Sequence, residues 1–352
     1  MNHSLKTCQT FDETQIINLI KKDYLDFCLQ YDVSEHRFEF SAIADNNLNT
    51  SMHILGNGIL GINLDSTDEN AKSIVLSCGV HGNETAPIEI CNDLVNALTH
   101  GQLTTPHRIL FIFGNIPSML IAERFVEENL NRLFSYELPI KTNEGARAKE
   151  LMDSVDSFFS DAKDGRYHYD LHTAIRPSKN EKFAVYPFLH GKPYSKSQLA
   201  FLSCCDVNTI LLSQSPTTTF SYFSSVNYNA HAFTVELGKV MPFGKNDMSK
   251  FNAVRSSLIN LITEKHLTLP AYEACPIEVY QVNQVINKQQ EDFALHFSDS
   301  LANFESFKKD DVLASETGKV YKAKVDGEAV VFPNANVAIG QRAILTVVPH
   351  KI

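Results

Sequence analysis

One stretch of the sequence places an imidazole and a carboxylate at the end of a buried strand. In Ile74 to Ile90 (IVLSCGVHGNETAPIEI), His81 is followed by Glu84, with glycines at 79 and 82. Glycines let the backbone bend sharply enough for the two side chains to converge on one point. Imidazole plus carboxylate suits Zn²⁺, which catalytic sites hold with three protein groups and leave open to water. We therefore interpret this stretch as half of a metal site.

The pair alone is weak evidence, and a second copy of it shows why. With 13 His in the chain, roughly one His-x-x-Glu pair is expected by chance. His36 and Glu39 form such a pair, in an alternating strand-like run (RFEFSAI). That pattern is typical of a solvated strand face. What distinguishes His81 and Glu84 is a candidate third ligand further along the chain.

A later strand supplies that candidate. Tyr167 to Thr173 (YHYDLHT) carries His168, Asp170 and His172, and these side chains share one face because side chains alternate along a strand. His172, nearest the strand end, is the predicted third metal ligand, and Asp170 is predicted to orient a ligand imidazole. A lone His in a strand is more often structural, so both interpretations stay open at this point.

Arginines that follow predicted strands are candidate partners for a substrate anion. Arg124, Asn131 and Arg132 come after the strand at 108–113 (RILFIF), and Arg176 follows the strand that carries His172. The planar guanidinium donates two parallel hydrogen bonds to a carboxylate. The alternative is that these are surface arginines paired with neighbouring glutamates.

Glu236 is a carboxylate near the end of an otherwise apolar, β-branched strand, His231 to Leu237 (HAFTVEL). A buried Glu with a raised pKa beside a metal-bound water would serve as a general base. The alternative is an exposed Glu at the point where the strand emerges.

The elements that must position these residues predict an α/β fold. Short apolar strands at 74–76 and 108–113 each end at a turn, and the carboxyl edge of such a sheet is where open α/β folds bind ligands. A hairpin turn is predicted at 56–58. Further strands are predicted at 38–43, 183–188 and 208–212, and helices at 13–31, from Thr85, and at 144–161, 196–205 and 249–265.

The chain of 352 residues exceeds a usual single domain. After 269–270 the pattern changes to short alternating runs with turn residues between them. We therefore predict a large α/β domain at 1–269 and a smaller β-rich domain at 270–352, with 301–318 (LANFESFKKDDVLASETG) as a solvated connection within the latter.

Composition narrows the class of protein. Hydrophobic residues make up 43% and charged residues 20%, a globular balance, and the formal charge of −10 argues against a nucleic-acid partner. The seven Cys lack metal-finger spacing, which suggests reduced thiols in a cytoplasm. Neither a signal peptide nor a membrane-spanning run is recognisable. The expectation is a cytoplasmic protein without a membrane partner.

Taken in order, these motifs resemble the zinc carboxypeptidase superfamily. HGNE at 81–84, DLHTAIR at 170–176 and VELGK at 235–239, together with the arginines, are most similar to its succinylglutamate desuccinylase and aspartoacylase branch, on the desuccinylase side. The resemblance covers nearly the whole chain and implies a mixed twisted sheet flanked by helices with a C-terminal β domain. Pro177 after Arg176 departs from the expected small residue, which puts the shape of that loop in doubt.

The resemblance also implies roles for the candidate residues. His81, Glu84 and His172 would hold one Zn²⁺ per chain, and Glu236 would be the general base. Arg124 would polarise the scissile carbonyl. The remaining candidates would bind carboxylates of a small anionic N-acyl amino acid, N-succinylglutamate: Asn131 and Arg132 one of them, and Arg176 a second.

Three functional hypotheses follow. The first is a zinc-dependent hydrolase that releases succinate and glutamate. The second is a deacylase for another N-acyl amino acid, such as N-acetylaspartate, or a carboxypeptidase. The third is a non-catalytic protein that binds zinc or carboxylates, against which a base at Glu236 and an oxyanion partner at Arg124 argue.

Overall fold

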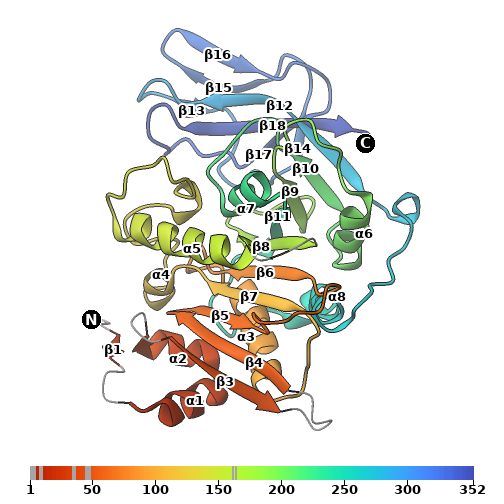
Figure 1. The fold of residues 1–352 in the computed structure, drawn as a ribbon. Coiled ribbons are helices and arrows are strands. Elements are labelled where there is room, and N and C mark those ends of the chain that lie inside the picture. The colour runs from red at the N-terminus through yellow and green to blue at the C-terminus, as the bar shows by residue number, and fades with distance from the viewer. Residues whose placement is uncertain (1–4, 8–10, 34–36, 44–48, 161, 163–164) are drawn as a thin grey trace.

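A continuous sheet runs through the whole molecule and carries every element of interest here. The computed structural model describes all residues except 1–4, 8–10, 34–36, 44–48, 161 and 163–164. In the described part, 13 strands pair in the order β14-β17-β18-β12-β10-β9-β11-β8-β6-β7-β5-β4-β3. The N-terminal strands lie at one end of the molecule and the C-terminal strands at the other (Figure 1). The predicted mixed sheet flanked by helices is confirmed.

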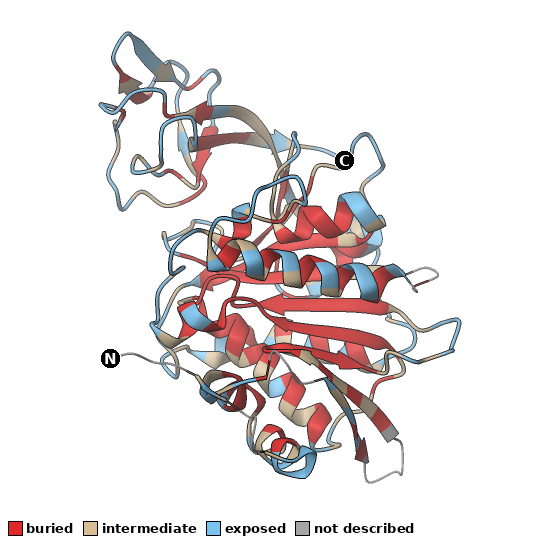
Figure 2. Cartoon of the chain, turned by 60° about the vertical axis from the view of Figure 1, so that its left-hand side comes forward, coloured by how far each residue is buried: buried red, intermediate tan, exposed pale blue. Residues whose placement is uncertain are grey.

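The centre of the sheet is parallel and buried on both faces. Its strands are β7 (Arg108–Phe113), β6 (Ser73–Cys78), β8 (Arg166–Ala174) and β11 (His231–Lys239). Adjacent strands in this group pair in parallel. Every residue of β6 and β7 is buried, as the central arrows of Figure 2 show. Their continuous apolar runs are what a strand covered on both sides requires, and their carboxyl ends meet at one edge.

Helices cover the two faces. Apolar side chains of α3 (Thr85–Thr99), α6 (Lys196–Cys204) and α8 (Asn252–Thr263) pack into one core with Ile74 and Leu76 of β6. Those of α5 (Asn143–Ser160) and α7 (Phe220–Tyr228) pack into another with Val75. The alternation along β6 therefore separates the two cores. Short helices lie at α4 (Ile116–Leu120), η1 (Leu130–Arg132), η2 (Met248–Phe251) and η3 (Tyr272–Ala274).

The N-terminal part differs from the prediction in one respect. The single helix expected at 13–31 is two helices, α1 (Glu13–Lys22) and α2 (Tyr24–Gln30). Asp23 between them is extended and caps α2, and its Oδ2 accepts hydrogen bonds from Asn92 and Asn96 of α3 at 2.9 and 2.8 Å. This tertiary contact ends α1. The predicted hairpin at 56–58 is confirmed, because β4 (Asn49–Gly56) pairs antiparallel with β5 (Ile59–Ile62) and with β3 (Phe38–Ile43).

The remaining strands are short or C-terminal. The first half of the chain also has β1 (Lys6–Thr7) and β2 (Tyr31–Asp32), while β9 (Phe183–Tyr186) and β10 (Thr209–Leu212) extend the central sheet. The C-terminal strands are β12 (Glu278–Asn287), β13 (Ala294–Leu295), β14 (Glu305–Phe307), β15 (Val312–Glu316), β16 (Lys319–Lys322), β17 (Glu328–Val331) and β18 (Arg342–His350). β12 pairs in parallel with β10, so the sheet crosses the predicted boundary at 269–270.

The solvated connection predicted at 301–318 is wrong. This segment contains β14 and β15, and its apolar residues Phe304, Leu313 and Ala314 are buried. They fill the small cores of the C-terminal strands. The charged run between them masked that role in the sequence.

A further property of the fold concerns membranes. Within the described ranges, no helix combines the length and the apolar character that crossing a bilayer requires.

Candidate active site

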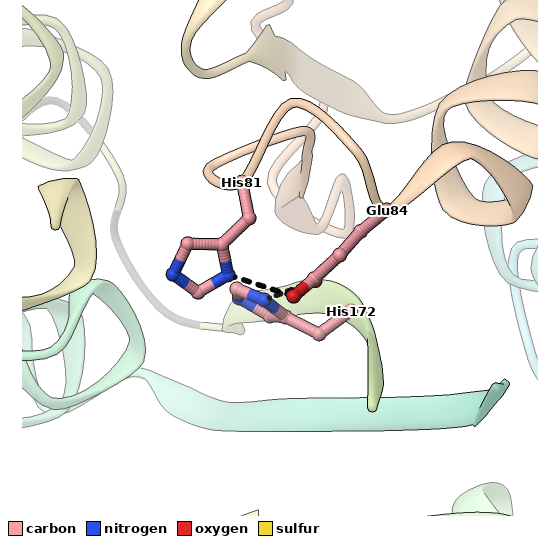
Figure 3. A group of neighbouring side chains, drawn as sticks. All are labelled: His81, Glu84 and His172. Atoms are coloured by element: carbon pink, nitrogen blue, oxygen red, sulfur yellow. Dashed lines mark hydrogen bonds and ion pairs between the residues drawn. The ribbon is translucent and has the colours of Figure 1, made fainter. Parts of the chain in front are cut away.

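Three buried side chains converge where β6 and β8 end. His81 Nδ1 lies 2.9 Å from Glu84 Oε1, and His172 Nδ1 lies 2.9 Å from Glu84 Oε2. Figure 3 shows the two rings and the carboxylate pointing at one another. Each residue offers a ligand atom within 4.8 Å of the others, so the group can hold a metal ion. The structure therefore brings together the three residues that the sequence predicted as ligands.

The turn that carries His81 and Glu84 depends on its glycines. A Cβ on Gly82 would lie 2.2 Å from the backbone carbon of Ser118 in α4, and Gly79 has φ of +61°. Any larger residue at either position would push α4 away. Glu84 then occupies the N-cap position of α3, without a side-chain hydrogen bond to the helix, where the helix dipole favours a negative charge. The local fold thus fixes both side chains.

Neighbouring groups orient the two imidazoles. His81 Nε2 lies 2.9 Å from Asn129 Oδ1, and His172 Nε2 lies 2.7 Å from Asp170 Oδ2. If Nε2–H donates in both rings, each Nδ1 lone pair faces the centre of the group. His81 Nδ1 is buried and lies 2.9 Å from Glu84 Oε1 without the geometry of a hydrogen bond. An unsatisfied buried acceptor beside a carboxylate fits a metal ligand.

Electrostatics hold the carboxylate of this group ionised. Although burial alone would raise it, the charges of His81 and His172 hold the pKa of Glu84 well below its usual range. Burial lowers the pKa of His81 to about 4. His81 is therefore neutral at neutral pH, the form in which an imidazole binds a metal. Although burial alone would lower it, the charges of Asp170 and Glu84 raise the pKa of His172 well above its usual range.

Asp170 belongs to a buried hydrogen-bond chain behind His172. Ser77 donates to Asp170 Oδ1 at 2.6 Å and contacts His168 Nε2 at 2.8 Å, and His168 Nδ1 reaches Ser224 of α7 at 2.7 Å. His168 therefore has the structural role that the sequence left open for a strand histidine. His172 differs, because its Nδ1 points at Glu84 instead.

Glu236 lies beside the three converging residues. It is 8% exposed, and its Cα is paired with that of His172 in the β11–β8 register. Burial, and then the charge of Glu84, raise the pKa of Glu236 to about 7. Its Oε2 is buried without a hydrogen-bond partner. A carboxyl with these properties can exchange a proton near neutral pH.

Arg124 borders the group on its open side. Its Nη1 donates to Glu84 Oε1 at 2.6 Å, and its side chain is 30% exposed while that of Glu84 is 2% exposed. The predicted surface pairing with neighbouring glutamates is therefore not what the structure shows for Arg124. Its partly exposed guanidinium therefore lies between the buried group and solvent.

Asn131 and Arg132 lie in η1, close to the start of α7. Asn131 is buried, and its Oδ1 accepts from the backbone N–H of Phe220 at 3.0 Å. Arg132 Nη1 donates to the carbonyl of Asn131 at 2.7 Å. Within the part of the chain that the structure describes, Arg132 forms no ion pair with a carboxylate. Arg132 thus offers an uncompensated positive charge.

Arg176 contacts Asp299, which lies in the connection between β13 and β14. Its Nη1 donates to the carbonyl of Asp299, and its Nη2 lies 3.8 Å from Asp299 Oδ1. The structure therefore does not place Arg176 in the buried group, and its role as a carboxylate partner stays a prediction.

The second His-x-x-Glu copy gives no comparable site. His36 lies outside the described residues, and Glu39 is on β3. Glu39 groups with His53 and Asp65, but Glu39 and Asp65 are exposed. Exposed acidic groups are common without a metal, so this cluster is not evidence of a metal site.

Sequence reasoning missed Asn129. Its Oδ1 contacts the ring of His81 and also accepts from the N–H of Asn131 at 3.0 Å. The signal was present, because Asn129 is a polar residue just before a predicted anion-binding pair. Only the fold shows that it faces His81.

Comparison with known families gives two matches. The succinylglutamate desuccinylase/aspartoacylase catalytic domain matches residues 70–262, and the AstE/AspA barrel-sandwich hybrid domain matches residues 275–350. The first match alone covers more than half of the chain. The chain belongs to the succinylglutamate desuccinylase/aspartoacylase family. The catalytic-domain match includes every residue of the site described above.

Similar proteins agree with this family. A Pseudoalteromonas atlantica protein named succinylglutamate desuccinylase is 56% identical over 310 residues, covering 86% of this chain and 88% of that protein. A Shewanella piezotolerans protein of the same name is 42% identical and covers 98% of this chain and 97% of that protein. The crystal structure of the Vibrio parahaemolyticus family member has a TM-score of 0.84 at 35% identity, covering 94% of this chain and 96% of that chain. The family resemblance and the C-terminal β domain predicted from the sequence are both confirmed.

Proposed function

We propose that this chain is a zinc-dependent amide hydrolase that cleaves N-succinylglutamate to succinate and glutamate. The observation that carries the proposal is the buried, unpartnered Glu236 Oε2 beside the converging His81, Glu84 and His172. A binding protein has no need of such a base. The substrate follows from relatives that bear the name succinylglutamate desuccinylase over nearly the full chain.

His81, Glu84 and His172 would hold the zinc ion. Two imidazoles with inward-facing Nδ1 atoms and one carboxylate are a donor set that zinc uses in catalytic sites. The buried Nδ1 of His81, which faces Glu84 without the geometry of a hydrogen bond, supports this assignment. When bound, zinc lowers the pKa of a water molecule toward about 7 and polarises a carbonyl.

Glu236 would act as the general base. Its carboxylate accepts a proton from the water that attacks the amide carbon, and the same oxygen then delivers that proton to the departing amine of glutamate. The raised pKa, about 7, matches both steps at neutral pH. Burial keeps bulk water from competing for the proton.

The cleft arginines would handle negative charge. Arg124 would stabilise the charge that develops on the scissile carbonyl oxygen, because its guanidinium is already aligned at the edge of the buried group. Arg132 would bind a substrate carboxylate together with the amide N–H of Asn131, since its charge has no acidic partner among the described residues. Arg176 would bind a second one if it left Asp299.

This reaction would place the enzyme in arginine catabolism by the succinyl route, in the cytoplasm. The formal charge of −10 of the whole chain contrasts with the arginines that follow its strand ends. Arginines concentrated against the overall charge favour a small anionic substrate over a nucleic acid.

Release of free glutamate from N-succinylglutamate tests the proposal. The purified protein should turn over this substrate, lose activity with a chelator and regain it with added zinc. N-acetylaspartate and a short peptide serve as controls. Turnover of only one of these controls would keep the hydrolase and replace the substrate, whereas zinc binding without any turnover would favour the binding-protein hypothesis.

A further inference from the structure

Glu144 is a buried carboxylate at the start of α5 that the proposed mechanism does not use. The residue is 3% exposed. Its Oε1 accepts from the backbone N–H groups of Val126 at 2.7 Å and Glu127 at 3.2 Å, and from the side-chain amide of Asn115 at 3.4 Å. Its Oε2 is buried and has no hydrogen-bond partner among the described residues. Because a buried carboxylate costs free energy unless donors satisfy it, Glu144 and the two backbone N–H groups depend on each other.

The segment that Glu144 binds lies between two residues of the candidate site. Arg124 precedes it and donates to Glu84 Oε1 at 2.6 Å. Asn129 follows it, and its Oδ1 lies 2.9 Å from His81 Nε2. Glu144 therefore holds the backbone of a short loop that reaches the three converging residues at both of its ends.

The other contacts of this loop are exposed or long. Phe125 and Val126 are 38% and 49% exposed, so apolar packing restrains them little. The carbonyl of Arg124 accepts from the N–H of Gly82 at 3.3 Å. Two further side-chain hydrogen bonds from the loop to the start of α5 are exposed to solvent. Ala122 has φ of +54°, a conformation that costs free energy for a residue with a Cβ. Glu144 thus supplies the buried contact that keeps this loop in place.

The residues after the loop are held by contacts that do not involve Glu144. The carbonyl of Asn129 accepts from the N–H of Arg132 at 3.0 Å. Asn131 Oδ1 accepts from the N–H of Phe220 at 3.0 Å, and the hydroxyl of Thr218 donates to the carbonyl of Arg132 at 2.7 Å. Loss of Glu144 should therefore displace Arg124 and leave the proposed carboxylate clamp where it is.

We propose that Glu144 is a positioning residue, which holds Arg124 against the carbonyl oxygen that becomes negatively charged during hydrolysis. It acts through the backbone N–H groups at 126 and 127. This inference rests on the proposed function, in which Arg124 stabilises that charge. A displacement of Arg124 by about 1 Å should cost roughly 100-fold in rate. The loss should appear in kcat, because the charge develops only in the transition state.

A double-mutant cycle with Arg124 tests the proposal. For N-succinylglutamate, kcat and KM are measured for Glu144→Ala, Glu144→Asp and Glu144→Gln, each alone and combined with Arg124→Gln. Asp keeps the charge but withdraws the oxygens by one methylene group, whereas Gln keeps an acceptor oxygen at the original distance. Glu150→Ala is the matched control, since Glu150 lies on the same helix and pairs with Arg147. Turnover is expressed per bound zinc ion, so that inactive protein is not counted.

The expected result is a loss of kcat that depends on Arg124. Glu144→Ala and Glu144→Asp should lower kcat by about 10- to 100-fold and keep KM within about 2-fold of wild type. Glu144→Gln should lose less, and Glu150→Ala should keep the wild-type kcat. Combined with Arg124→Gln, the same Ala and Asp substitutions should lower kcat by less than about 3-fold, because the residue that Glu144 positions is already missing.

Two outcomes of the cycle would overturn the proposal. An equal loss of kcat with and without Arg124 would mean that Glu144 only stabilises the fold. A wild-type kcat in both Glu144→Ala and Glu144→Asp would mean that Arg124 does not need this support. If Glu144→Ala does not fold, Glu144→Asp decides on the same criteria.

Chemical modification separates this inference from the proposed function. If the wild type does not cleave N-succinylglutamate, the proposed function fails, and the rate at which phenylglyoxal modifies each arginine then tests Glu144. Mass spectrometry after digestion follows Arg124, with Arg132 as an internal reference. Arg124 should react faster in Glu144→Asp than in wild type and Glu150→Ala, because it leaves Glu84, while Arg132 keeps its rate. Unchanged rates at Arg124, or a parallel rise at both arginines, would refute the positioning role.

Discussion

The two edges of the parallel sheet both bury histidine and have arginine nearby, yet they use these residues differently. At the carboxyl edge, His81 and His172 face a carboxylate, and Arg132 has no acidic partner among the described residues. At the amino edge, His107 and Arg108 are also buried, just where β7 begins. Burial of a basic side chain is therefore not a sign of function by itself. The groups that the side chain contacts indicate whether it serves the fold or the chemistry.

At the amino edge, backbone groups satisfy the buried bases. His107 Nδ1 accepts from the N–H of Lys72 at 3.2 Å, and His107 Nε2 lies 2.9 Å from the carbonyl of Glu264. Arg108 donates from Nε to the carbonyl of Leu64 at 3.1 Å. These bonds tie loops and the end of α8 to the sheet. Such hydrogen bonds satisfy buried polar groups and stabilise the fold.

Removal of one histidine from each edge should give the largest contrast. His172→Ala should lose zinc and all measurable turnover, because one of three ligands is gone. His107→Ala should keep zinc and kcat but lower the free energy of unfolding by about 1–3 kcal/mol, as buried partners lose their bonds. Metal analysis, turnover and urea unfolding check this. Full zinc occupancy in His172→Ala would mean that the third ligand is another residue.

Replacement of one carboxylate at each edge should give the next largest difference in activity. Glu236→Gln should retain zinc and lower kcat by about 100- to 10,000-fold, because the amide cannot accept the proton. The control is Glu264→Gln, whose side chain is exposed at the amino edge and whose kcat should not change. Steady-state kinetics with metal analysis decide. Near-normal turnover of Glu236→Gln would remove Glu236 as the base.

Two arginines extend the contrast to substrate binding. Arg132→Gln should raise KM for N-succinylglutamate by about 10- to 100-fold as a charged hydrogen bond is lost. Arg108→Gln should leave KM unchanged and lower only stability, since its partners are Leu64 and Ser73. Kinetics and thermal unfolding of both variants separate the two roles. A KM that does not move in Arg132→Gln would contradict the carboxylate clamp.

The site was largely predictable because its residues sit at the ends of periodic strands. β6 and β8 have clear strand patterns, and His81 and His172 follow from their position at the strand ends. Glu236 was detectable as a carboxylate in an apolar strand. In each case the pattern of one strand named the candidate, because parallel strands bring their carboxyl ends to one edge. The family resemblance then implied its role.

The missed features depend on contacts between distant segments. α7 has a sequence, FSYFSSVNY, of weak helix formers, and its first N–H is bound by Asn131 from a remote loop. Asn129 gains its importance only from its contact with the ring of His81. The split of the first helix at Asp23 likewise depends on Asn92 and Asn96. No pattern within one element contains such information.

The smallest expected effect is on the pH dependence of stability. It tests the amino edge alone, through the contribution of His107 to the free energy of unfolding. Burial lowers the pKa of His107 from 6.5 to about 4, so between these values the unfolded chain binds a proton that the folded chain refuses. The free energy of unfolding therefore falls as pH drops from about 6.5 toward 4, by at most about 3 kcal/mol from this group. His81 titrates in the same range and does so equally in a His107→Gln variant, so the difference between the two proteins reports His107 alone. Urea unfolding at several pH values should show the wild type losing stability faster than His107→Gln on acidification. Parallel curves would mean that His107 is protonated in the fold and that the amino edge is less closed than its hydrogen bonds indicate.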